Sequence, residues 1–146
     1  MREYSSTVTI SRPPDEVFAY LVEPAKQAQW SDVAMRPLTD GPLRLGSRME
    51  LAFGRMPVRM TLVLEVTGYE QDRRTAFSTV SRGSLTWNGE YRLEPADSGG
   101  TRLSQSGQLR FSGLARLIES IVAAEIRRNE IKELERLKTT VETNRS

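Results

Sequence analysis

The sequence contains neither cysteine nor histidine. Their absence excludes a thiol nucleophile, a histidine-based catalytic triad and a zinc site built from cysteine and histidine ligands. We therefore expect no metal site. Carboxylates, tyrosine, arginine and side-chain amides are present, so acid–base chemistry stays open.

The chain also lacks any apolar run approaching the ~20 residues that a membrane-spanning helix needs. Residues 1–6 contain no apolar stretch of the kind that opens a secretory signal, so a cytoplasmic location is expected. The sequence also lacks a large excess of either charge: its 21 Lys and Arg and its 19 Asp and Glu give a net charge of only +2. Nucleic-acid binding uses clustered basic residues and is not expected here.

The glycines around residues 54 and 83 belong to predicted turns and form no phosphate-binding motif, so we expect no cofactor. No repeat, linker or low-complexity tract divides the chain. Its 146 residues are enough for one hydrophobic core. A single domain over residues 1–146 is the resulting prediction.

Alternating apolar residues predict a succession of strands joined by turns, and 3.6-residue spacing predicts helices near both ends. The expected helices span residues 13–22, 25–29 and about 113–142, and the expected strands span 4–10, 32–38, 48–53, 58–67, 74–81, 84–93 and 101–111. This order indicates an α+β domain in which a curved antiparallel sheet of about seven strands surrounds one long C-terminal helix. Two short helices lie between strands one and two.

The last helix has two apolar faces. One face carries Leu114, Leu117, Ile118, Ile121 and Val122, and a nearly opposite face carries Leu134, Leu137 and Val141. We interpret the first face as the lid of a cavity under the sheet, with the second face packing elsewhere. The alternative is a helix that uses its second face to form a dimer, and the expected state is a monomer or a homodimer.

The chain resembles the START-like superfamily, also called SRPBCC or birch-allergen-like, and within it the bacterial polyketide cyclase/dehydrase branch. The residues that carry the resemblance are 10–21 (ISRPPDEVFAYL), Pro24, Trp30, 111–114 (FSGL) and 137–142 (LKTTVE). The resemblance implies a helix-grip fold, in which the sheet wraps the long helix around an apolar cavity. In such relatives the cavity receives sterols, lipids, plant hormones or polyketide intermediates.

Under that fold, the inward rows of the strands and the first face of the helix would line the cavity. The same residues could instead fill a solid core, and Trp30 could anchor the short helices rather than sit at a cavity mouth. The predicted cavity residues are Trp30, Met49, Leu51, Phe53, Met60, Leu62, Leu64, Trp87, Tyr91, Gln105, Leu109, Ile118, Ile121 and Glu125.

Three polar residues stand out among these. Gln105 and Tyr91 lie on otherwise apolar strand faces, and Glu125 lies one helical turn after Ile121. A carboxylate desolvated in a cavity could act as a general base, so Glu125, Tyr91 and Gln105 are the candidate catalytic residues. The alternative for Glu125 is an exposed ion pair with Arg128 on the helix surface.

The resulting hypothesis is binding of a small hydrophobic or aromatic molecule, polyketide- or lipid-like, in an internal cavity without a cofactor. One alternative is an enzyme similar to polyketide cyclases, aromatases or dehydratases. Another is association with a protein or a membrane surface through an exposed apolar face of the C-terminal helix.

Overall fold

We analysed a computed structural model of the chain. It describes residues 2–31, 34–55, 58–80 and 85–144, and for residues 34, 53–55 and 58–60 it describes the backbone alone. The side chains of Phe53 and Met60, both predicted to line a cavity, therefore lie outside the described part.

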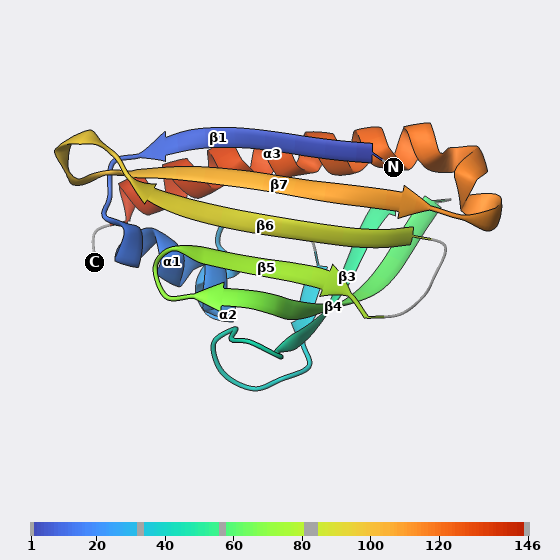
Figure 1. Ribbon diagram of the computed structural model, residues 1–146, viewed down its shortest axis with the longest axis horizontal. Helices are drawn as coiled ribbons and strands as arrows, with labels where there is room; N and C mark the ends of the chain where they lie inside the picture. Colours follow the sequence, from blue (N-terminus) through green and yellow to red (C-terminus); the bar gives the residue numbers. More distant parts are fainter. Residues whose placement is uncertain (1, 32–33, 56–57, 81–84, 145–146) are drawn as a thin grey trace.

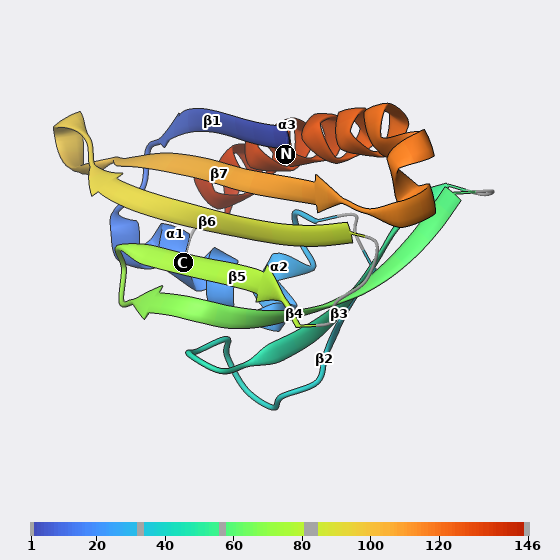
Figure 2. The ribbon, with the colours of Figure 1, turned by 45° about the vertical axis from the view of Figure 1, so that its right-hand side comes forward.

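The elements follow the predicted order, and a curved sheet covers one long helix (Figures 1 and 2). The seven strands pair antiparallel throughout, in the order β1-β7-β6-β5-β4-β3-β2. This confirms the predicted helix-grip fold. The strands are β1 (Arg2–Ile10), β2 (Ala34–Pro37), β3 (Arg48–Arg55), β4 (Val58–Glu70), β5 (Arg74–Thr79), β6 (Leu85–Pro95) and β7 (Thr101–Phe111); the helices are α1 (Pro14–Val22), α2 (Pro24–Gln27), α3 (Glu119–Thr143) and the 3-10 turns η1 (Asp97–Gly99) and η2 (Gly113–Ile118).

The helix pair α1 and α2 fills the end of the sheet near the C-terminus of α3 (Figure 1). Pro14 stands in the first turn of α1, where its missing N–H costs no hydrogen bond, and Asp15 and Glu16 favour the positive end of the helix dipole. Trp30 follows α2, is 2% exposed, and donates a hydrogen bond from Nε1 to the carbonyl of Tyr20 at 2.8 Å. It thereby ties the segment after α2 to α1.

The central strands alternate cleanly between the core and solvent. In β7 every second residue from Thr101 to Phe111 is buried, and four of the β6 residues paired with them are buried too: Leu85, Trp87, Gly89 and Leu93. This period of two places one face of the sheet against α3 and leaves the other face to water.

The long helix begins later than predicted and packs the other way round. Residues 113–118 form the 3-10 turn η2, and α3 proper begins at Glu119. Leu134, Leu137 and Val141 are buried against the sheet and α1, whereas Leu114, Leu117 and Ile121 are 84%, 82% and 66% exposed. Val122 of the first face is buried and Ile118 is half-buried, but no residue of this face lines the cavity. The prediction that the first face covers the cavity is therefore wrong, because the stripe that packs on the sheet runs from Val122 and Ile126 to Leu134, Leu137 and Val141.

A row of two glycines flanked by two aromatic rings crosses the middle of the sheet. Tyr4 on β1 pairs with Gly107 on β7, Gly107 pairs with Gly89 on β6, and Gly89 pairs with Phe77 on β5. All four positions face the core, and the rings of Tyr4 and Phe77 lie over the glycines, where a Cβ atom would collide with them. Glycines covered by neighbouring aromatic rings are a device by which curved sheets bend.

We predict that Gly107→Ala destabilises the fold by about 1–3 kcal/mol, because its methyl group overlaps the Tyr4 ring in a packed interior. Urea unfolding measures the change. Ser106→Ala, one residue away on the exposed face of β7, is the matched control and should change stability by less than about 0.5 kcal/mol. Equal stability of the two variants would contradict this account of the bend.

Candidate functional site

An internal cavity of about 70 Å³ lies between the sheet and α3. Its apolar wall includes four aromatic rings, those of Trp30, Phe77, Trp87 and Tyr91. Polar groups enter from α2, the segment after it, β5 and α3. The remaining lining residues are Leu21, Gln27, Ser31, Met35, Leu43, Met49, Leu51, Leu64, Val66, Thr75, Glu130 and Glu133.

Six of the residues predicted from sequence line this cavity: Trp30, Met49, Leu51, Leu64, Trp87 and Tyr91. Three others, Leu62, Gln105 and Leu109, are buried but belong to the surrounding core. Ile118 is half-buried at the end of η2, and Ile121 is exposed. Neither residue lines the cavity: Ile121 faces solvent, and Ile118 packs against the surrounding core.

Glu125 does not enter the cavity either. Its carboxylate lies on the surface of α3 and accepts a hydrogen bond from Arg128 Nη2 at 2.7 Å, in an i,i+3 ion pair. This is the alternative arrangement considered above, and it removes Glu125 from the candidate catalytic residues.

The carboxyl groups at the cavity come instead from Glu130 and Glu133, which are only 7% and 9% exposed. They lie one helical turn from Ile126 and from Leu134 and Leu137, on the stripe that α3 buries. The spacing of four residues from Leu134 to Glu130 and from Leu137 to Glu133 is the sequence signal that could have located them.

Glu130 sits in a small polar network around the cavity. Tyr91 hydrogen-bonds its carboxyl group, and Gln105 Nε2 donates to its backbone carbonyl at 2.9 Å and to Ser6 Oγ at 2.9 Å. Gln105, a predicted catalytic candidate, thus holds the helix backbone against β1 and β7.

Two further hydrogen bonds place the other polar groups. Ser31 Oγ donates to Glu133 Oε1 at 3.0 Å. Trp87 Nε1 donates to the Tyr4 hydroxyl at 2.8 Å. The first bond links α3 to the segment after α2 on one side of the cavity. The second links β6 to the edge strand β1 on the other side.

Burial dominates the electrostatics of this network. It raises the pKa of Glu130 to about 8, with the nearby charge of Glu133 adding to the rise and the hydrogen bond from Tyr91 opposing it. Burial and the same carboxylates raise the pKa of both Tyr91 and Tyr4 above the usual tyrosine value. At neutral pH Glu130 is therefore mostly a neutral acid, which can donate a hydrogen bond or exchange a proton with a bound molecule.

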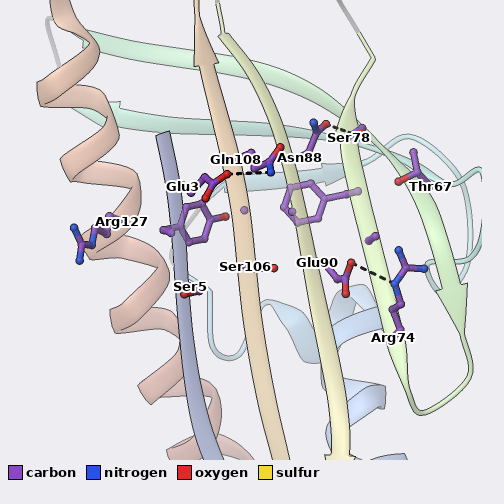
Figure 3. Close-up of a pocket in the computed structure, with 15 residues that line it drawn as sticks. Glu3, Ser5, Thr67, Arg74, Ser78, Asn88, Glu90, Ser106, Gln108 and Arg127 are labelled. Carbon is purple, nitrogen blue, oxygen red and sulfur yellow. Dashed lines mark hydrogen bonds and ion pairs between the residues drawn. The ribbon is translucent and has the colours of Figure 1, made fainter. Parts of the chain in front are cut away.

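A larger depression, of about 690 Å³, lies on the opposite, solvent-facing side of the sheet (Figure 3). Its polar side chains bond one another: Arg74 pairs with Glu90 at 3.3 Å, and Ser78 donates to Asn88 at 2.6 Å. Such cross-strand pairs are typical of a solvated strand face. We place the candidate site in the inner cavity, where carboxyl groups are desolvated and aromatic rings gather.

Within the described residues, no three or more acidic side chains gather in a way that could hold a metal ion. In the same part of the chain, no helix is both long and apolar enough to span a bilayer.

The raised pKa of Glu130 predicts how stability depends on pH. Between about 4.5 and about 8 the unfolded chain has released this proton while the folded chain retains it, so the free energy of unfolding falls as pH rises through that window. Urea unfolding at pH 5, 7 and 9 should show Glu130→Gln increasingly more stable than the wild type, by on the order of a few kcal/mol at pH 9. Glu125→Gln, on the same helix but exposed, should follow the wild type; parallel curves for all three proteins would contradict the prediction.

Comparison with known proteins indicates the family to which the chain belongs. A family model described as polyketide cyclase / dehydrase and lipid transport matches residues 1–142. No curated protein sequence matches the chain.

Many solved structures share the fold at low sequence identity. TTHA0849 from Thermus thermophilus has a TM-score of 0.75 at 17% identity, with 96% of this chain and 97% of that protein covered. Ara h 8.0201 has a TM-score of 0.72 at 13% identity, covering 98% and 99%. DynU16, a protein of the dynemicin biosynthetic locus, has a TM-score of 0.68 at 19% identity, covering 97% of this chain and 47% of that one.

The order of elements, the closure of the sheet on α3 and the match over residues 1–142 agree with the resemblance seen in the sequence. The chain belongs to the polyketide cyclase / dehydrase and lipid transport family.

Proposed function

We propose that this protein binds a small hydrophobic or aromatic molecule in the cavity between the sheet and α3. The observation that carries the proposal is a cavity with apolar and aromatic walls and a few polar groups from α3, β5, β6 and the region of α2. Binding sites for small molecules commonly combine such walls with a small number of polar contacts.

The volume of the cavity limits the size of the ligand that we expect. Its volume of about 70 Å³ is roughly half of the ~150 Å³ engineered cavity in which another protein holds benzene. A molecule of a few heavy atoms fits the space as it stands. A lipid or a polyketide would require the wall side chains to move apart, so we propose small ligands or a small headgroup of a larger one.

The test is direct binding of small neutral alcohols, ethanol and isobutanol, followed by the fluorescence of Trp30 and Trp87, which both line the cavity. Native mass spectrometry of the purified protein would detect a ligand carried from the cell. A protein that carries no ligand and binds neither alcohol would contradict the proposal.

We predict that Met49→Phe weakens alcohol binding at least ~10-fold, because Met49 lines the cavity, is 5% exposed, and the added ring takes up the remaining space. Leu45→Phe is the matched control, since Leu45 is 67% exposed and remote from the cavity lining. Unchanged affinity in Met49→Phe would place the ligand elsewhere on the protein.

A second candidate is an acid–base enzyme of the kind expected from the sequence, with Glu130 in the role first assigned to Glu125. The observation that favours it is the hydrogen bond between Glu130 and Tyr91 at a desolvated cavity, with a Glu130 pKa near 8. A carboxylate with such a pKa could remove a proton from the carbon next to a ketone and return it to the same carbon.

This candidate predicts that the protein accelerates exchange of the α-protons of butanone with deuterium oxide, and that the rate rises with pH up to about 8 as Glu130 ionises. Proton NMR follows the exchange. Glu130→Gln should lose the acceleration, by ~10²-fold or more, whereas Glu125→Gln keeps it. If Glu130→Gln exchanged the protons as fast as the wild type, Glu130 would not be the base.

A further inference from the structure

The groups at the cavity that can carry a charge are acidic. Its ionisable lining residues are Glu130, Glu133 and Tyr91, and among the described lining residues there is no lysine or arginine. Glu130 also makes no ion pair with a basic side chain in the described part of the structure. A negative charge on a bound molecule would therefore be repelled.

A third acceptor comes from α2. Gln27 lines the cavity from α2, and its Oε1 atom is buried and accepts no hydrogen bond from the described residues. A buried acceptor without a donor costs about 1–3 kcal/mol, so it marks a place where a ligand can supply the missing N–H. This observation is independent of the two carboxyl groups.

The walls add a further preference for positive charge. Four aromatic rings line the space, and the faces of such rings attract cations at short range, more strongly when the cation is desolvated. Apolar walls also shield the carboxyl groups from water, which strengthens any charge pair formed inside.

We propose that the ligand of this cavity is a small primary or secondary amine, bound as an ammonium ion between Glu130, Glu133 and Gln27. The inference rests on the proposed function and names its ligand class. The ammonium group donates hydrogen bonds to the acceptors, while its hydrocarbon part lies against the aromatic wall.

Binding is coupled to a proton. An ammonium ion in water meets the neutral Glu130 carboxyl group, whose proton leaves to solvent, and a carboxylate–ammonium pair remains. The groups facing Glu130 are Glu133 on its own helix, Tyr91 on β6 and Tyr4 on β1. Burial and the charge of Glu133 disfavour an isolated negative charge on Glu130, and the hydrogen bond from Tyr91 opposes them only in part. The apparent affinity for the amine should therefore rise up to tenfold per pH unit below the Glu130 pKa of about 8 and release up to one proton.

The test compares three molecules with nearly the same hydrocarbon part: isobutylamine, isobutanol and isobutyrate. Isothermal titration at pH 7 in two buffers of different ionisation enthalpy measures affinity and the number of protons released. We expect isobutylamine to bind at least ~10-fold more tightly than isobutanol with proton release, and isobutyrate not to bind.

Two variants test whether the carboxyl group of Glu130 causes the preference for the amine. Glu130→Gln should lose the preference for the amine over isobutanol and the proton release, and Glu125→Gln, remote from the cavity lining, should behave as the wild type. Isobutanol binding equal to or tighter than isobutylamine would overturn the amine inference and leave the proposed function standing. Failure of all three molecules to bind would overturn both, and a preference retained in Glu130→Gln would overturn the assignment to this carboxyl group.

Discussion

The structure depends on a sheet that bends enough to lie against a single helix. The bend runs through Gly107 and Gly89, where the absence of a Cβ lets the rings of Tyr4 and Phe77 lie flat over the neighbouring strands. Those same rings then serve the interior: Phe77 forms part of the cavity wall, and Tyr4 accepts the hydrogen bond of Trp87. The curvature of the sheet and the aromatic wall of the cavity thus both depend on these glycines and the rings that cover them.

The second constraint is the direction in which α3 meets that curved surface. Its C-terminal stripe contains the apolar residues Leu134, Leu137 and Val141, but the same stripe also brings Glu130 and Glu133 inside. Burying carboxyl groups in an apolar interior opposes folding, and replacing them with apolar residues would remove the cost. Their presence at a cavity is typical of a site where function is maintained against stability.

The inner and outer faces of the sheet illustrate how local pairing separates a solvated surface from a site. On the outer face, charged side chains such as Arg74 and Glu90 form ion pairs across strands beside open solvent (Figure 3). On the inner side, the Gln27 oxygen of α2 accepts no hydrogen bond from the described residues, and Glu130 of α3 keeps its proton at neutral pH. The smaller inner space combines desolvated carboxyl groups with aromatic walls, which the solvated outer depression does not.

The sequence by itself determined the order of strands and helices along the chain and indicated an antiparallel sheet, because alternation in segments such as 101–111 is a local property with a period of two. It also identified six of the sixteen residues that line the cavity, among them Trp30, Trp87 and Tyr91. Only the tertiary structure decided which of the two apolar faces of the last helix is buried. Both faces satisfy helical spacing, and the choice depends on where the curved sheet meets the helix, a contact between residues far apart in the chain. That choice moved the site from Glu125, which pairs with Arg128 at the surface, to Glu130 in the interior.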